Sequence, residues 1–367
     1  MRLGVEFAPA LDRSGGDVPD SAPVTVVIPT FNRASDLERG LSHLALQTVG
    51  ELRAVVVDNG STDRTPEMIR GLMPAWGGRL CYIRREPNGP ASARNTGLAA
   101  TTTPYVLFLD SDIDLPADWV ERALAHFAES PGLGAVGGYI LYAFNSAGVN
   151  AYGGDLGRMG LAWDVDEGTV LDPSKGPAQR IWINCSAMLA RTDAVRLAGG
   201  FDESFFYGHE DTDLGWRLNL VGYRVAVFPD LRAKHNVSED PGRAHPEIVF
   251  HSCKNRLRSM LKNASPGNLL VMLAGYAAYT FADVLARAPR RAKVRAVGWN
   301  LAHLGETLAM RREVQRKRSV PDSVIFGLGS GRWLPLTALG GRRRRPAGLA
   351  SRMGSAHSNR SAVDDRL

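Results

Sequence analysis

The sequence predicts an α/β protein with an open, mostly parallel sheet flanked by helices, followed by a C-terminal helical extension. From Val24 onward, short β-branched apolar runs alternate with amphipathic stretches, which is typical of repeated strand–helix–strand units. Polar and acidic residues directly follow several of these runs, at the sheet edge where open α/β folds bind their ligands.

The first half of the chain carries the clearest elements. Leu37, Leu41 and Leu44 form one apolar face of a helix. Ser35 and Glu38, three residues apart near its start, match the pattern of a capping box. A second helix after Pro116 is predicted to bury Trp119, Ala123, Leu124 and Phe127. The predicted strands, which we expect to be parallel, are residues 24–28, 54–57, 80–83 and 105–109.

The later elements are less regular. Residues 138–177 are rich in Gly, Asp and aromatics with little periodicity, and we interpret them as loops over the sheet. A return strand is expected at residues 181–190, a helix at 214–221 and a strand at 223–228. The predicted segments are a disordered arm (1–22), an α/β domain (23–240), a basic helical extension (241–320) and a basic disordered tail (321–367).

Composition limits the classes of protein. A chain of 367 residues with 44% hydrophobic and 22% charged residues is globular, with room for one large domain and an appendage. Cys81, Cys185 and Cys253 are an odd, widely spaced set, which argues against a disulfide framework and a zinc knuckle. The first twenty residues contain acidic side chains and no apolar run typical of a signal peptide, so we expect a cytoplasmic protein.

An acidic triplet, Asp110-Ser111-Asp112, follows the predicted strand at residues 105–109. Two carboxylates at a strand's carboxyl end can hold Mg²⁺ or Mn²⁺, and such an ion can neutralise a diphosphate. Taken alone, an Asp-x-Asp fits an acidic, helix-capping turn better than a metal site. The triplet therefore depends on support from other residues.

Two earlier strand ends supply that support. The first ends in Pro29, Thr30, Phe31 and Asn32, and the second runs from Asp58 and Asn59 to Asp63. In a doubly wound sheet these loops can converge with the triplet on one crevice, where an aromatic ring and short polar groups suit a base and a ribose. Taken singly, Asn59-Gly60 also fits a plain turn and Asp63 a helix cap.

Charged residues further along complete the candidate set. Arg94 lies near the start of a predicted helix, where it can pair with phosphate oxygens or simply lie on the surface. Glu210, Asp211 and Asp213 open another helix; we expect at least one to face the cleft, and Asp211 or Asp213 also fits a helix cap. His235 can offer an imidazole to a metal, although a lone loop histidine is commonly solvated.

Five motifs occur in the order found in family 2 glycosyltransferases, which the sequence resembles over residues 23–240. They are VVIPTFN (26–32), VDNGSTD (57–63), NGPASARN (88–95), DSD (110–112) and GHEDTDL (208–214). The resemblance implies a GT-A fold and an inverting enzyme that takes a nucleotide-diphosphate sugar as donor.

The resemblance also implies roles. Asp211 is the expected general base, Asp112 and His235 the ligands of Mg²⁺ or Mn²⁺, with Glu210 and Asp213 in support. The expected donor-binding residues are Pro29, Thr30, Phe31, Asn32, Asp58, Asn59, Arg94, Asp110 and Ser111. Asn59, where many relatives have Asp, and HSCKNRLR at residues 251–258 resemble rhamnosyltransferase-like members. The expected donor is therefore a dTDP- or UDP-sugar, dTDP-rhamnose included, and the acceptor a hydroxyl of a glycan, lipid-linked or small molecule.

The C-terminal third is basic and favours a second interpretation, a non-catalytic protein that binds nucleic acid or anionic lipid. Few aromatics lie among the basic residues, which argues against nucleic acid. The apolar run at residues 269–282 is shorter than the ~20 residues of a spanning helix and has basic residues on both sides. We expect a helix packed on the domain or lying at the cytoplasmic membrane surface on anionic lipid, with a helical bundle carrying solvated charges as the alternative.

Overall fold

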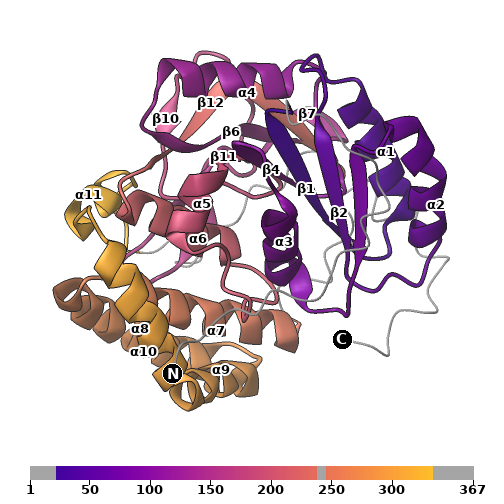
Figure 1. The fold of residues 1–367 in the computed structure, drawn as a ribbon. Helices are drawn as coiled ribbons and strands as arrows, with labels where there is room; N and C mark the ends of the chain where they lie inside the picture. Colours follow the sequence, from indigo (N-terminus) through magenta and orange to yellow (C-terminus); the bar gives the residue numbers. More distant parts are fainter. Residues whose placement is uncertain (1–21, 238–244, 334–367) are drawn as a thin grey trace.

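A computed structural model of the protein describes residues 22–237 and 245–333. Within these residues, a central ten-stranded sheet has helices on both faces. A further group of helices packs against the helices of one face (Figure 1). The predicted arm up to residue 21 and the tail from residue 334 lie outside the described residues.

The sheet is parallel in its N-terminal half. The strands in spatial order are β3 (Leu80–Arg84), β2 (Arg53–Asp58), β1 (Val24–Thr30) and β4 (Tyr105–Leu109). These four strands confirm the predicted ones. Helices cover both faces of the sheet here, and β1 is buried along its whole length. This burial explains why valine and isoleucine dominate β1 and β2.

The other half of the sheet is mixed in direction. β11 (Ala187–Arg191) runs antiparallel between β4 and β6 (Leu133–Tyr142), and β6 pairs in parallel with β12 (Arg224–His235). The remaining strands of this sheet, all antiparallel to their partners, are β5 (Ile113–Asp114), β7 (Asn145–Ala151) and β10 (Ala178–Gln179). The predicted α/β class is confirmed, with a mixed sheet in place of a mostly parallel one.

The interpretation of residues 138–177 as loops is wrong. β6 and β7 pass through them, and β8 (Gly154–Leu156) and β9 (Ala162–Asp164) form a small second sheet. Glycine is needed for this pairing, since a Cβ on Gly138 would lie 1.8 Å from the carbonyl oxygen of Leu231 on β12. The expected return strand is confined to β11, and β12 continues to His235, which is therefore a strand residue and not a loop residue.

Two sets of helices sandwich the sheet. One face carries α1 (Ala34–Ala45), α2 (Thr65–Leu72) with the short η1 (Met73–Trp76), and α4 (Trp119–Glu129). The other carries α3 (Gly89–Ala100), α5 (Thr192–Ala198) and α6 (Glu210–Leu220). The predicted apolar faces are buried except for the half-buried Leu124.

The predicted capping box of α1 is wrong. Arg33 occupies the N-cap position, and Ser35 lies inside the helix. The amide of Ala34 donates instead to Oδ2 of Asp63 at 3.1 Å. Asp63 belongs to the loop after β2. The start of α1 is therefore held by a contact between the first two strand-end loops, and not by a cap within the helix itself.

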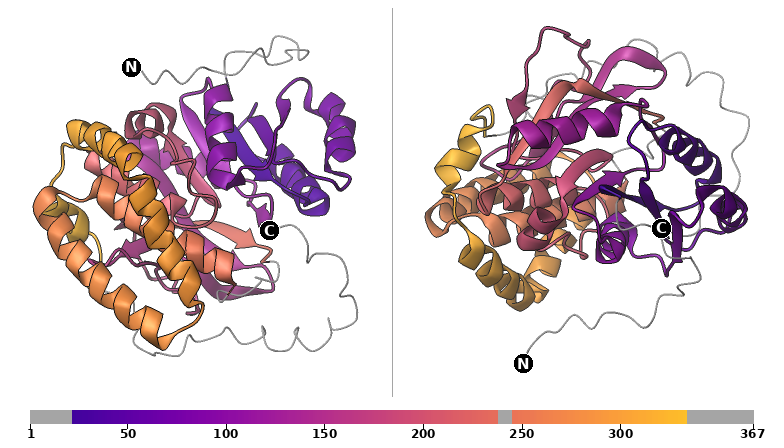
Figure 2. Two further views of the ribbon diagram at one scale, coloured as in Figure 1. Left: turned by 90° about the horizontal axis from the view of Figure 1, so that it is seen from below. Right: turned by 45° about the horizontal axis from the view of Figure 1, so that its top comes forward.

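The C-terminal helices form an added layer against α6, seen from two directions in Figure 2. Ion pairs buried between layers hold it: Nζ of Lys262 lies 2.6 Å from Asp202 and 3.1 Å from Asp213, and Nε of Arg258 lies 2.8 Å from Asp202. The helices are α7 (Pro246–Asn263), α8 (Pro266–Ala286), α9 (Arg290–Ala302), α10 (Leu304–Lys317) and α11 (Asp322–Gly327).

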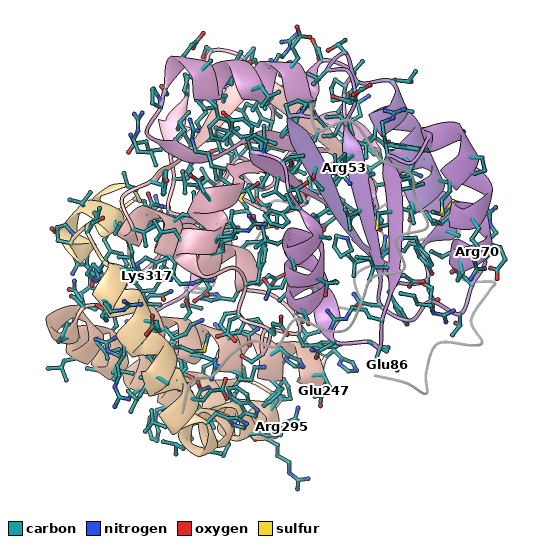
Figure 3. The ribbon with its side chains drawn as sticks, viewed as in Figure 1. Arg53, Arg70, Glu86, Glu247, Arg295 and Lys317 are labelled. Carbon is teal, nitrogen blue, oxygen red and sulfur yellow. The ribbon has the colours of Figure 1, made fainter. Side chains whose placement is uncertain are left out.

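Surface contacts also join these helices. Glu247 on α7 and Arg295 on α9 lie side by side at the lower edge of the molecule, 2.5 Å apart (Figure 3). Helix α11 lies inside the predicted tail. Two contacts hold it on the protein: Asp322 pairs with Arg318 at 2.6 Å, and Phe326 packs edge-on against Trp216 of α6. Helical structure therefore continues past the predicted end at residue 320.

Candidate active site

The strand-end loops meet at one cavity of about 900 Å³. The loops after β1, β2 and β4 converge because parallel strands present their carboxyl ends at the same sheet edge. The predicted site residues that line the cavity are Pro29, Thr30, Phe31, Asn59, Arg94, Asp110, Ser111, Asp112, Glu210 and His235.

Asn32 and Asp58 are not among the lining residues, and both brace the loops. Asn32, at a positive φ of 52°, accepts from the amide of Thr62 at 2.7 Å. Asp58 is fully buried and accepts from the amide of Ser61 at 2.8 Å and from the hydroxyl of Tyr82 at 2.5 Å. These contacts fix the shape of the first two loops.

Two polar atoms at this end of the cavity are ready to bind a ligand. Oγ1 of Thr30 and Oδ1 of Asn59 are buried and have no hydrogen-bond partner among the described residues. Leaving a buried acceptor unpaired costs about 1–3 kcal/mol, so a ligand that donates to these atoms recovers that free energy. Phe31 stands beside them with half of its surface exposed (51%).

Arg94 is the ionic centre of the site. Its Nη2 lies 2.8 Å from Oδ1 of Asp110, and its Nη1 lies 3.2 Å from Oε1 of Glu210 and 3.9 Å from Oδ1 of Asp211. The side chain is only 4% exposed, so it is not a surface arginine. One buried cation thus ties the acidic triplet to the acidic start of α6.

Burial changes the acidity of the pair on α6. Desolvation, with the charge of Asp211 adding to it, raises the pKa of Glu210 to about 7. Desolvation also raises the pKa of Asp211, opposed by the charge of Arg94 and by hydrogen bonds from Cys185. Each carboxylate is therefore a stronger base than its type normally is at the surface.

Asp213, the third acidic residue, faces away from the cavity. It is completely buried, and its Oδ2 lies 2.7 Å from Nη2 of Arg217 on the same helix. Lys262 and Asn263 of α7 hold the same carboxylate. Asp213 anchors α6 to α7, while Glu210 is the member of the acidic group that lines the cavity.

Asp112 and His235 form a pair suited to a divalent metal. Oδ2 of Asp112 lies 3.5 Å from Nε2 of His235 and 2.9 Å from Nη1 of Arg33. Burial alone would raise the pKa of Asp112, but the hydrogen bond and charge of His235 and the charge of Arg33 hold it below its usual value. Nδ1 of His235 lies 2.9 Å from Oδ1 of Asn150, which orients Nε2 toward Asp112.

These donors fit Mg²⁺ or Mn²⁺ bound jointly with a substrate. The described residues contain no cluster of three or more His, Cys, Asp or Glu side chains able to hold a metal alone. Mg²⁺ sites commonly use one or two carboxylates together with substrate phosphates and water. A carboxylate and an oriented imidazole at the cavity wall meet that requirement.

A second wall of the cavity carries no recognisable motif, and the sequence reasoning missed it. It consists of Ala162, Trp163 and Asp164 on β9, with Asn184, Tyr207, Ile248, Val249, Ser252 and Cys253. The last four lie on α7 at spacings of four residues, so they share one face of that helix. This periodicity was the only signal in the sequence that could have found them.

Comparison with known proteins identifies the family. The Glycosyl transferase family 2 model matches residues 25–150, and the Glycosyl transferase family group 2 model matches residues 105–264. Glycosyltransferase AglE of Haloferax volcanii is 32% identical over 230 residues, which cover 62% of this chain and 69% of AglE. The chain belongs to the family 2 glycosyltransferases.

Other relatives of this glycosyltransferase differ in length. The pre-mycofactocin glycosyltransferase of Mycobacterium tuberculosis is 35% identical over 59% of this chain, which spans only 43% of that protein. The N-acetylglucosaminyl-diphospho-decaprenol L-rhamnosyltransferase of the same organism is 27% identical over 61% of this chain and 78% of its own length.

Solved structures show the fold of this glycosyltransferase. Residues 1–349 of TarS from S. aureus match with a TM-score of 0.51 at 18% identity, over 83% of this chain and 88% of that one. GalNAc-T7 matches with a TM-score of 0.55 at 16% identity, over 67% of this chain and 48% of that one. The predicted GT-A fold is thereby confirmed, with helices following it.

Proposed function

We propose that this glycosyltransferase is a metal-dependent, inverting hexosyltransferase that moves a sugar from a dTDP- or UDP-sugar to an acceptor hydroxyl. The observation that carries the proposal is the ionic centre at Arg94, which pairs with Asp110 and Glu210 at the cavity wall and with Asp211 just behind that wall. The metal pair Asp112 and His235 lines the same cavity. Leaving-group stabilisation and proton transfer can therefore act on one bound donor.

The nucleotide end of the site is assigned to the first two loops and the triplet. The unpaired Oγ1 of Thr30 and Oδ1 of Asn59 can accept hydrogen bonds from a base, and Phe31 offers an exposed ring. Asn59 and the mycobacterial relative named as a rhamnosyltransferase favour dTDP-rhamnose as donor. Pro29, Asn32, Asp58, Asp110 and Ser111 complete the proposed donor site.

The metal is assigned to Asp112 and His235. Bound Mg²⁺ or Mn²⁺ would neutralise charge that develops on the diphosphate as it leaves. Without the ion, Arg33 and His235 balance the charge of Asp112, so the chain keeps this carboxylate ionised and ready to bind.

Proton transfer is assigned to Asp211. The acceptor hydroxyl attacks the anomeric carbon on the face opposite the departing diphosphate, and the Asp211 carboxylate takes its proton as the new bond forms, which inverts the configuration. Desolvation raises the pKa of Asp211 and so strengthens it as a base. Arg94 holds the carboxylate in place, and Glu210 shares that cation.

Part of the basic C-terminal third is buried and unavailable to nucleic acid. Lys254, Arg258, Lys262 and Lys293 are all under 5% exposed and point inward to ion pairs or carbonyl groups. They stabilise the contact between helices and cannot neutralise phosphates at the surface. The basic flank before the apolar run, noted in the sequence, is thus structural.

For the cellular location, we propose a cytoplasmic protein held peripherally at the inner membrane face by α8. Of the helices in the described ranges, α8 alone is long and apolar enough to cross a membrane, and only 17% of its most apolar stretch is buried. Leu270, Phe281 and Leu285 are each more than 60% exposed. Arg287, at the end of α8, and Arg295 on α9 are half exposed and can face anionic headgroups.

A donor screen tests the catalytic proposal. The full chain is incubated with dTDP-rhamnose or one of a set of UDP-sugars, together with a mixture of octyl and methyl glycosides as acceptors, with and without Mn²⁺, and release of the nucleoside diphosphate is measured. We expect release from one donor class, dependent on the metal. Absence of release from every donor in the presence of Mn²⁺ contradicts the proposal.

Vesicle flotation tests the location. The wild-type chain should float with vesicles containing anionic phosphatidylglycerol and less with neutral phosphatidylcholine vesicles. A variant with Phe281→Asp and Leu285→Asp should stay at the bottom of the gradient, whereas Val170→Asp, at a surface valine far along the chain and 75% exposed, should float as wild type does. Equal flotation of all three refutes the role of α8.

A further inference from the structure

Resting on the glycosyltransferase function above, we propose that the second wall of the cavity is an acceptor site for a glycoside, meaning a sugar ring that carries an apolar aglycone. The donor and metal residues account for only part of the cavity lining. Most of the rest comes from β9, Asn184, Tyr207 and one face of α7. None of these residues belongs to the five motifs.

Trp163 and Asp164 supply the features that a sugar ring requires. Trp163 is half-buried and presents a rigid aromatic surface at the cavity wall, suited to the apolar face of a pyranose. The carboxylate of Asp164 lies beside it and can accept from hydroxyl groups. Strand pairing with Asp155 fixes the backbone at Trp163, and a 2.9 Å hydrogen bond from Asn184 holds the carboxylate of Asp164.

Asn184 links this wall to the proposed base. Its Nδ2 donates to Asp164, whereas its Oδ1 is buried and has no hydrogen-bond partner in residues 22–237 or 245–333. The next residue, Cys185, hydrogen-bonds Asp211. An acceptor hydroxyl that donates to Oδ1 of Asn184 is thus held on the segment that also holds the base.

The α7 side of the wall is apolar. Ile248, Val249 and Cys253 line it, and Ser252 is the one hydroxyl among the four α7 residues. Val249 and Cys253 also pack against the small core formed by Phe250 and α9, so the surface is firm. A fully hydrophilic acceptor leaves this surface in water, whereas an apolar aglycone removes it from water, which is favourable.

A paired acceptor series tests the assignment, with the donor and metal found in the screen. The probes are n-octyl β-glycosides of glucose, galactose, N-acetylglucosamine and mannose, the four matching methyl glycosides, and 1-octanol. We expect at least one octyl glycoside to be glycosylated with a KM about tenfold or more below that of its methyl partner, since burying even two CH₂ groups suffices for that ratio. 1-Octanol, which lacks the ring, should not react.

Variants separate the two halves of the site. Trp163→Ala should raise the KM of both glycosides about tenfold while the KM of the donor stays within about twofold, and Trp163→Phe should restore most of the loss. Val249→Asp should raise the KM of the octyl glycoside only. Val170→Asp, outside the cavity, should match wild type throughout.

The outcomes distinguish this assignment from the function beneath it. Equal KM values for octyl and methyl glycosides, a reaction with 1-octanol as good as with any glycoside, or donor hydrolysis without transfer to any probe each overturn the acceptor assignment and leave the glycosyltransferase function standing. Failure to release nucleoside diphosphate from any donor refutes the function and the acceptor site together.

Discussion

Replacing Asp211 with Asn tests the proposed proton transfer directly. Asp211 lies in the first turn of α6, and its buried Oδ1, 3.9 Å from Arg94, has no hydrogen-bond partner in the described part of the chain. Asn has the same size but cannot take a proton, so the variant should fold normally. Removal of a general base costs about 10²–10⁴-fold in rate. We expect kcat to fall by about that factor, with little change in the KM of the donor.

Glu210→Gln is the matched control, because Glu210 shares Arg94 and lines the cavity. Desolvation raises the pKa of Glu210 from 4.5 to about 7, which corresponds to about 3 kcal/mol of unfavourable ionisation. Since the folded state resists this ionisation, it loses stability relative to the unfolded chain as pH rises from 4.5 to 7. Gln removes that loss, so the unfolding free energy at pH 8 should rise by up to about 3 kcal/mol and at pH 4 should not.

The same control makes a prediction about the pH dependence of activity. Glu210, with a pKa raised to about 7, is mostly protonated below that pH, and its charge is not among the causes that raise the pKa of Asp211, so the acidic limb of the kcat profile should stay in place in Glu210→Gln. The assay is nucleoside-diphosphate release at saturating donor and Mn²⁺ across pH 5–9. If Asp211→Asn keeps turnover near wild type while Glu210→Gln loses a hundredfold or more, the base is Glu210 and the assignment is wrong.

Further variants test the metal pair, the buried ion pairs and the α7 contact. Asn150→Ala, which frees the ring of His235, should raise the Mn²⁺ concentration for half-maximal activity about tenfold; an unchanged titration would show that this hydrogen bond does not orient the ligand. Lys262→Met should lower the unfolding free energy by about 3 kcal/mol in urea at pH 7. Because Lys262 and Arg258 hold the pKa of Asp202 far below its usual value, wild-type stability should be lost as pH falls below about 4, and this loss should be smaller in the variant. Asn255→Ala removes donors to the carbonyls just before α6 and should lower kcat about tenfold at constant donor KM; parallel changes in both would indicate general unfolding.

The sequence predicted the regular half of the sheet and failed in the irregular half for a definable reason. β1, β2 and β4 are short apolar runs between helices, so their burial is visible in the sequence. β6 contains Gly134, Gly137 and Gly138, and the glycine-rich segment that begins at Gly138 suggested loops. The structure needs them small, since a Cβ on Gly134 would lie 2.5 Å from Tyr223 and one on Gly138 would overlap the backbone of β12. That requirement comes from a segment about ninety residues away and leaves no local pattern.

The candidate site divides in the same way. Most of the predicted site residues meet at the cavity, because the loops that carry many of them follow strands whose ends share one edge of the sheet. Many of the residues missed, such as Trp163 and Val249, are apolar or aromatic, and their type alone does not distinguish a cavity wall from a core. Asp213 illustrates the converse: its position in an acidic motif fitted either a cleft residue or a helix cap, whereas packing against Lys262 places it inside the protein.

Helix α7 contacts the proposed catalytic residues, although the domain boundary predicted at residue 240 separates it from them. Asn255 donates to the carbonyl oxygens of Tyr207 and Gly208 at 3.0 and 2.7 Å, directly before the turn that presents Glu210 and Asp211. Four residues on the preceding turns of α7 line the cavity, and Lys262 on the following turn binds Asp202 and Asp213 behind it. The same helix therefore positions the proposed base, forms part of the proposed acceptor wall and carries the charges that lock both to the sheet. Because these contacts lie on one helix, a change in the packing of α7 should displace the proposed base and the acceptor wall together. The C-terminal helices are therefore part of the structure that positions the active site.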